Sequence, residues 1–159
     1  MPRKGGGIRL PKIKKPPMIS RPLGRGSPIK EPEVLPPYGY PPPTWPGTEA
    51  EWAVNWALTK LKVLFYFQFP VSGGRTQFGG SVADFYLPEY HTALYVMGVY
   101  WHYERGVESL NADKLTKMIL EGYGYSVIWI DEDDALKNPT YYVQEAMRGK
   151  DHSRGMSGV

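Results

Sequence analysis

The sequence predicts an α/β protein with a mixed β-sheet flanked by helices, preceded by an extended, Pro-rich and basic N-terminal arm. After Thr48, helical and strand-like apolar patterns follow in the order helix, strand, strand, strand, helix, strand, helix. Before that point the composition changes, because residues 1–47 hold 13 of the 16 prolines. We therefore expect an arm over 1–47, one folded domain over 48–149 and a polar tail over 150–159.

The predicted arm is basic, whereas the predicted domain is acidic. The first 30 residues hold nine Lys or Arg and no Asp or Glu, and the rest of the chain has ten basic and 16 acidic residues. Such a segment cannot bury a core, so it is expected to be extended when alone. It is either a solvated tail or an arm that lies on nucleic acid or threads into a large assembly. The basic residues proposed to contact DNA are Arg3, Lys4, Arg9, Lys12, Lys14 and Lys15.

The domain is expected to begin with a helix and a strand. Thr48-x-x-Glu51 has the form of a capping box and directly precedes apolar residues at helical spacing. The aromatic segment Leu64–Phe69 predicts a short strand. We expect the next residue, Pro70, to end that strand because proline cannot donate a ladder hydrogen bond.

A Gly-rich loop and two further strands are expected next. Residues 71–80 contain two Gly-Gly pairs, which predict a loop. Arg75 in this loop is a candidate phosphate contact, because the flanking glycines let the backbone approach a ligand closely. It is equally explained as a solvated loop arginine. Strands are expected at about 81–87 and 92–98.

The remaining elements are expected to be a helix, a buried strand and a helix. Asn111 is interpreted as the N-cap of a helix that runs to Glu121. Residues 125–130 are nearly all apolar, as a buried strand would be, and a last helix is expected from Asn138 to Gly149. The acidic stretch 131–134 is interpreted as a solvated turn and the cap of that last helix. The predicted inner face of the middle helix comprises Leu115, Met118 and Ile119.

Asp84 and His102 are the strongest candidates for chemistry. Asp84 lies on the second predicted strand, and His102 follows the third strand after Gly98. A carboxylate and an imidazole brought together by neighbouring strands suit a divalent metal and an activated water. These are the parts needed to cut a phosphodiester.

Several residues of the domain, taken in this order, resemble the very-short-patch-repair (Vsr)-like endonucleases and their phage-type relatives. These belong to the restriction-endonuclease-like PD-(D/E)XK superfamily. The resemblance extends from about Thr48 to Ala146. The matching residues are Thr48, Glu51, Gln68, Asp84, Phe85, Gly98, Val99, Tyr100, Trp101, His102, Asp113, Gly124 and Tyr125.

The resemblance implies a metal-dependent DNA endonuclease with Asp84 at its centre. An Asp in this position holds the catalytic Mg²⁺, helped by a main-chain carbonyl of the next strand. His102 and Asp113 correspond to residues that help activate water and orient the substrate, and Glu51 to a glutamate near the site. The setting that the resemblance suggests is phage DNA processing. The aromatic pair that would wedge into the base stack is Tyr100 and Trp101.

Each candidate also has a structural explanation, and the sequence leaves both open. The capping box accounts for Glu51, and a place in the first turn of a helix accounts for Asp113. His102 would serve as a hydrogen-bonded structural histidine. Tyr100 and Trp101 would serve as packing residues.

The sequence departs from the family in ways that favour a second interpretation. Many members carry Asp/Glu-x-Lys where this chain has Tyr95-Val96-Met97, and no lysine occurs between Leu64 and Asp113. Without Cys, the Cys-bound structural zinc of the mismatch-directed enzymes is excluded. The alternative is a catalytically inactive nuclease-fold protein of a phage virion or other large assembly, bound to other chains through residues 1–47.

Membrane insertion and secretion are not expected. No apolar run approaches the ~18 residues that a spanning helix needs. The N-terminus lacks the apolar core of a signal peptide. The expected location is the cytoplasm of a host cell or a virion.

Overall fold

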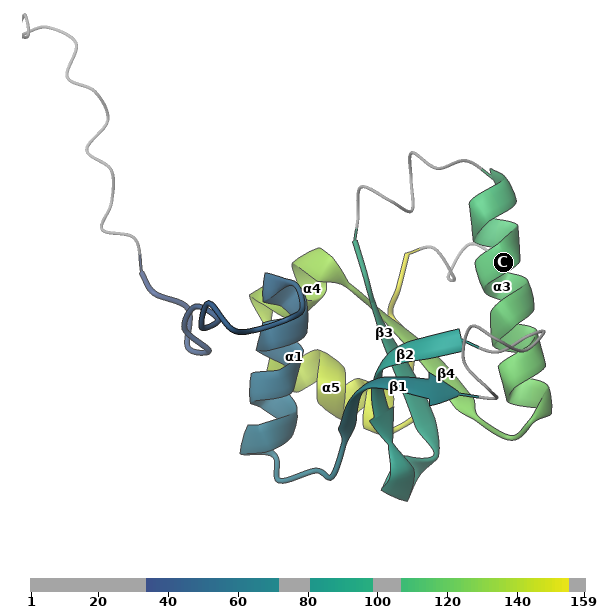
Figure 1. Ribbon diagram of the computed structural model, residues 1–159, viewed down its shortest axis with the longest axis horizontal. Helices are drawn as coiled ribbons and strands as arrows, with labels where there is room; N and C mark the ends of the chain where they lie inside the picture. The colour runs from purple at the N-terminus through teal and green to yellow at the C-terminus, as the bar shows by residue number, and fades with distance from the viewer. Residues whose placement is uncertain (1–33, 72–80, 99–106, 155–159) are drawn as a thin grey trace, which may run out of the picture. The chain divides into compact units, whose positions relative to one another are not determined.

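A computed structural model describes residues 34–71, 81–98 and 107–154, except for the side chains of 107–110. The chain divides between Leu35 and Pro36, and the compact unit begins at Pro36. Its elements are α1 Glu49–Lys60, β1 Tyr66–Val71, β2 Ser81–Leu87, the 3₁₀ helix η4 Pro88–Tyr90, β3 Thr92–Met97, α3 Val107–Gly122, β4 Ser126–Asp131, α4 Glu132–Lys137 and α5 Pro139–Met147 (Figure 1).

The strands form one mixed sheet in the order β1-β2-β3-β4. The β1–β2 and β2–β3 pairs are antiparallel, whereas β3 and β4 are parallel. The connection from β3 to β4 contains α3, as a parallel crossover requires. The predicted mixed sheet flanked by helices is therefore confirmed.

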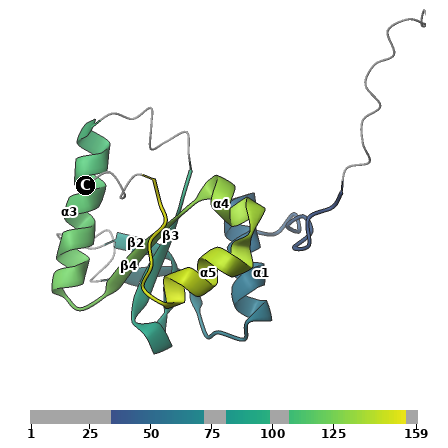
Figure 2. The same cartoon turned by 180° about the vertical axis from the view of Figure 1, so that it is seen from behind.

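Helices cover both faces of the sheet (Figures 1 and 2). On one face α1, α4 and α5 pack over a core that includes Leu58, Phe85, Leu94 and Val143. On the other face α3 contributes Leu120 to a smaller core. Helices far apart in the sequence thus pack against the two faces of the same four strands.

The capping box predicted at the start of α1 is present. The Thr48 side chain accepts a hydrogen bond from the Glu51 N–H at 3.1 Å, and Glu51 Oε2 accepts one from the Thr48 N–H at 3.2 Å. This pair satisfies two of the backbone donors that a helix start leaves free. The Glu51 side chain is therefore held at the N-terminal end of α1.

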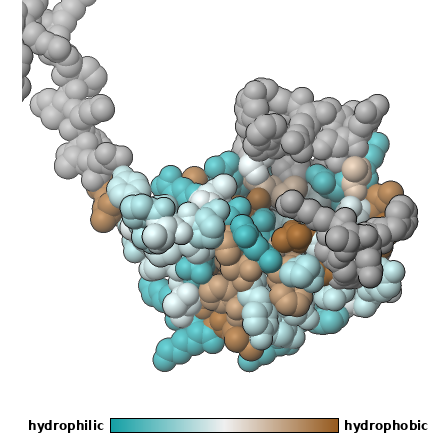
Figure 3. Space-filling view, viewed as in Figure 1, coloured by the Kyte–Doolittle hydropathy of each residue, from teal (hydrophilic) through white to brown (hydrophobic). Residues whose placement is uncertain are grey.

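The prediction that Pro70 ends the first strand is wrong. β1 runs from Tyr66 to Val71, and Pro70 pairs with Val82 inside it. The reason is that β1 is the edge of the sheet, where a residue without an N–H is tolerated. Figure 3 shows apolar surface in the middle of this face of the molecule. Tyr66 of β1 is 48% exposed.

The expected start of the middle helix is also wrong, as are two of the three residues expected on its inner face, whereas the third, Ile119, is half-buried. α3 begins at Val107, so Asn111 and Asp113 lie inside the helix rather than at its first turn. Leu115 and Met118 are 54% and 67% exposed. The residues of α3 that face the sheet are spaced three or four positions apart, as on one side of a helix, and most of them are polar. They are Asp113, Thr116, Lys117 and Leu120.

The acidic stretch after β4 forms a helix of its own. α4 covers Glu132–Lys137, and Asn138 then caps α5 by accepting a hydrogen bond from the Tyr141 N–H at 3.2 Å. Three acidic residues in the first turn of α4 suit the positive end of the helix dipole. The interpretation of this stretch as a solvated turn and the cap of the last helix was therefore wrong, because it forms a helix and Asn138 supplies that cap.

Residues 36–47 differ from the predicted arm because they pack on the folded unit. Tyr38 is 7% exposed, and its hydroxyl donates to the Leu136 carbonyl at 2.9 Å. The Trp45 ring lies against Trp52 and Phe67, with centroids 5.2 and 4.6 Å apart. The aromatic residues of a Pro-rich segment thus extend the core where composition alone predicts none.

The first part of the predicted polar tail is also packed. Ser153 is 1% exposed, and Asp151 Oδ2 accepts a hydrogen bond from the Trp129 N–H of edge strand β4 at 2.9 Å. Residues 150–154 therefore cover part of the outer edge of the sheet. Within the described residues, no helix is long and apolar enough to cross a membrane.

Candidate functional site

Asp84 lies where two strands of the sheet separate. β2 and β3 pair from Leu87–Thr92 to Phe85–Leu94, and Asp84 is the next residue of β2. Its Oδ2 accepts a hydrogen bond from the Val96 N–H at 2.7 Å. The side chain thus supplies the acceptor that β3 loses when the main-chain ladder ends.

Gln68 marks the same position on the neighbouring strand. It lies opposite Asp84, between the pairs Phe67–Phe85 and Phe69–Ala83, and has a φ of 52°. Phe67 packs in the α1-side core but Phe69 in the α3-side core, so the alternation of β1 is interrupted here. A left-handed conformation is unfavourable for a residue with a Cβ. The site is therefore built on an irregular point of the sheet.

The Asp84 carboxyl is held in an unfavourable environment for its charge. Burial raises its pKa to about 7, and the negative charge of Glu51 adds to this, against the opposing effect of the Val96 N–H. Burial also raises the pKa of Glu51, although hydrogen bonds from Thr48 oppose the change. Among the described residues, no basic side chain is paired with Asp84. A cation at this point would relieve the repulsion.

A cavity of about 210 Å³ lies next to this pair on the α1 side of the sheet. Its wall includes Val96, whose N–H binds Asp84, and Ala50, the neighbour of Glu51 in α1. Glu132, at the start of α4, is the carboxylate in the wall itself. The α1 side of the site therefore offers a cavity with one carboxylate in its wall.

A second cavity, of about 90 Å³, lies between the sheet and α3. Asp113 faces it together with Ser81, Tyr95 and Lys117. The negative charge of Asp84 raises the pKa of Tyr95, an effect smaller than that of burial. Glu51 therefore acts on Asp84 from the α1 side of the sheet, whereas Asp113 lies on the α3 side, in the cavity that Tyr95 also lines.

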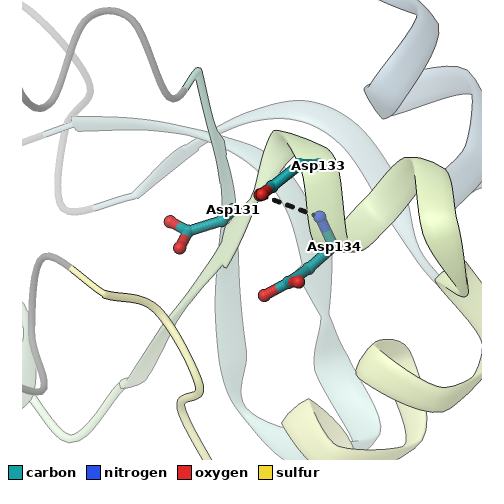
Figure 4. Close-up of side chains that lie close together, drawn as sticks. All are labelled: Asp131, Asp133 and Asp134. Carbon is teal, nitrogen blue, oxygen red and sulfur yellow. Dashed lines mark hydrogen bonds between the residues drawn. The ribbon is translucent and has the colours of Figure 1, made fainter.

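A separate group of carboxylates stands at the end of β4 (Figure 4). Oxygens of Asp131, Asp133 and Asp134 lie within 4.8 Å of one another, as the ligands of a divalent ion would. Arg154 already binds this group: its Nε–H donates to Asp131 Oδ2 at 2.9 Å, and its Nη2 donates to Asp133. A metal ion here would compete with this guanidinium, whereas Asp84 has no such competitor among the described residues.

The remaining predicted site residues lie outside the described part of the chain. They are Arg3, Lys4, Arg9, Lys12, Lys14, Lys15, Arg75, Tyr100, Trp101 and His102.

Sequence reasoning gave no role at the site to two residues that line its cavities, Glu132 and Tyr95. Glu132 was included in an acidic stretch interpreted as a turn, although its place directly after a buried strand was a usable signal. Tyr95 was counted only as part of an apolar strand. Gln68 was among the residues that carry the resemblance, but nothing in the sequence predicts its left-handed backbone.

Comparisons with known proteins give one partial structural likeness. No protein-family model matches the sequence, and no curated protein matches it either. Among solved structures, the chain is similar to the catalytic domain of the homing endonuclease I-Bth0305I. The two are 25% identical over 62% of this chain and 93% of that one, with a TM-score of 0.47. A likeness with this TM-score carries no functional argument. The function is therefore inferred from the residues around Asp84.

Proposed function

We propose that the chain is a divalent-metal-dependent DNA endonuclease of the Vsr-like type, with Asp84 as the metal ligand. The observation that carries this proposal is the buried Asp84 carboxyl, which lies close to Glu51 and has no basic partner among the described residues. Carboxyl groups whose pKa is raised by burial and by a neighbouring negative charge are common at functional sites. Carboxylate oxygens are the ligands that Mg²⁺ prefers, and it keeps several waters besides.

The residues around Asp84 divide the work of phosphodiester hydrolysis. A divalent ion at Asp84 would polarise the phosphoryl oxygen and stabilise the charge that develops on it. The Val96 N–H fixes the orientation of the Asp84 carboxylate. Asp113 would accept the proton of the attacking water, and His102 is proposed to assist it. Glu51 adds negative charge that favours a bound cation.

Binding of DNA is proposed to depend on segments beyond the described residues. The basic residues of the arm and Arg75 would contact phosphates, acting in part by release of counterions. Tyr100 and Trp101 would contact bases. A function in phage DNA processing belongs to the same proposal.

The apolar stretch Tyr95–Met97 supports the second candidate function. It offers no side-chain carboxylate or lysine next to Asp84. In that case the chain is a nuclease-fold protein without activity, bound in a virion or another assembly through its N-terminal arm. The experiment that follows separates the two functions.

The test is cleavage of supercoiled, single-stranded and branched DNA by the full chain. We expect nicking or linearisation that requires Mg²⁺ or Mn²⁺, stops with EDTA and is lost in Asp84→Ala. Glu89→Gln, which changes an exposed carboxylate of η4, should cleave like the wild type. Failure of the folded wild-type protein to cleave any of these substrates would contradict the endonuclease and favour the assembly protein.

A further inference from the structure

The Tyr95 hydroxyl is a buried polar group without a hydrogen-bond partner of normal geometry among the described residues. An unpaired buried hydroxyl is costly, and native structures contain few of them without a reason. Burial raises the Tyr95 pKa and the charge of Asp84 adds to this, whereas a weak hydrogen bond with the Ser81 side chain, outside normal geometry, opposes it. The phenol therefore keeps its proton and remains a hydrogen-bond donor.

The cavity beside Tyr95 is suited to water. Its volume of about 90 Å³ exceeds the roughly 10–15 Å³ that one water molecule requires. Its wall includes the side chains of Ser81, Tyr95 and Asp113, which provide both donors and acceptors. The Thr116 hydroxyl is already used, because it donates to the Ala112 carbonyl at 3.1 Å. A water here would find the two to four polar partners that hold buried water in place.

We propose that this cavity holds the attacking water, and that the Tyr95 hydroxyl orients it by donating a hydrogen bond to its oxygen. The assignment rests on the proposed endonuclease function and adds a residue to it. Tyr95 lies beside Val96, which is bonded to Asp84, and it shares the cavity with Asp113. The water would thus lie beside the residue that removes its proton, in contact with a tyrosine that also senses the charge of Asp84.

The chemical step balances with the groups named. The water oxygen forms a bond to phosphorus while the bond from phosphorus to the 3′-oxygen breaks. The proton lost by the water passes to the Asp113 carboxylate, and a solvent water protonates the 3′-oxygen. The products are a 5′-phosphate and a 3′-hydroxyl. The Tyr95 hydroxyl keeps its proton throughout and acts only as a donor.

The test compares Tyr95→Phe with the wild type in steady-state cleavage and in thermal unfolding. Tyr95→Phe should lower kcat by roughly tenfold, the effect of one hydrogen bond to the reacting water, and leave KM unchanged. Its Tm should change little, because the change removes a hydroxyl that makes no hydrogen bond of normal geometry among the described residues. The control is Tyr86→Phe, whose hydroxyl is bonded to His91 Nδ1 at 3.1 Å, away from this cavity. Its kcat should equal that of the wild type.

Each other result has a definite meaning. A wild-type kcat in Tyr95→Phe would overturn the role of Tyr95 while leaving the endonuclease intact. A loss of kcat accompanied by a lower Tm would show a structural role and would also overturn it. Absence of cleavage by the wild type would overturn the endonuclease and the assignment together. The two failures are therefore distinguished by the wild-type measurement alone.

Discussion

Asp84→Asn should abolish metal-dependent cleavage and at the same time stabilise the metal-free protein at pH 8. The folded-state pKa of Asp84 is raised from 3.8 to about 7, so its contribution to stability is present below pH 4 and is lost as the pH rises through 7. The loss amounts to at most roughly 4 kcal/mol. Asparagine removes the charge but keeps an acceptor for the Val96 N–H. Its free energy of unfolding should therefore exceed that of the wild type at pH 8 and match it near pH 3.

The effect on catalysis should be the larger one. Loss of the metal ligand should reduce kcat by on the order of 10³-fold, since the metal contributes several kcal/mol of transition-state stabilisation. Unfolding in denaturant with EDTA, at pH 3 and pH 8, measures the first effect, and cleavage with Mn²⁺ measures the second. Glu89→Gln should change neither. A destabilised Asp84→Asn at pH 8, or one that cleaves normally, would mean that Asp84 is a structural residue.

Tyr38→Ala should destabilise the protein by about 3–5 kcal/mol, as truncation of a buried aromatic residue does. The Tyr38 ring lies against Trp56 with centroids 6.3 Å apart, and the Tyr38 carbonyl accepts a hydrogen bond from Trp52 Nε1 at 2.9 Å. Tyr38→Phe removes only the hydroxyl bond to Leu136 and should cost about 1 kcal/mol. Denaturant unfolding of both variants gives these values.

The comparison variant is Tyr123→Ala, because Tyr123 is 65% exposed. Its unfolding free energy should stay within about 0.5 kcal/mol of the wild type. If Tyr38→Ala were equally neutral, residues 36–47 would be the solvated arm that the composition suggests. A large loss would show that residues from Pro36 onward contribute to the stability of the domain. Shortened chains for further work should then start at or before Pro36.

Local patterns in the sequence were enough to predict much of the fold. The capping box at Thr48 and Glu51 was predictable because it depends on residues three positions apart. The second and third strands and the mixed sheet followed from the apolar patterns. Asp84 was identified as a site candidate, and it lies where the strands separate.

The features that sequence reasoning missed depend on contacts between distant segments. The way α3 packs on the sheet turns Asp113 and Lys117 inward. The apolar residues Leu115 and Met118, which helical periodicity would place inside, remain exposed. Tyr38 is buried through Leu136, 98 positions away. The Tyr95 hydroxyl became visible as an unpaired group only when its surroundings were known. Such relations leave no periodic signal in a single sequence.

The central claim is that a divalent ion binds at Asp84, and calorimetric titration with Mn²⁺ tests it most directly. The wild type should show one site whose affinity falls roughly tenfold from pH 8 to pH 6, because the ligand must lose a proton whose pKa is about 7. Asp84→Asn should lose this site. Asp133→Asn, which changes the other carboxylate group, should keep it. Binding that survives in Asp84→Asn and disappears in Asp133→Asn would place the ion at the end of β4 and contradict the account.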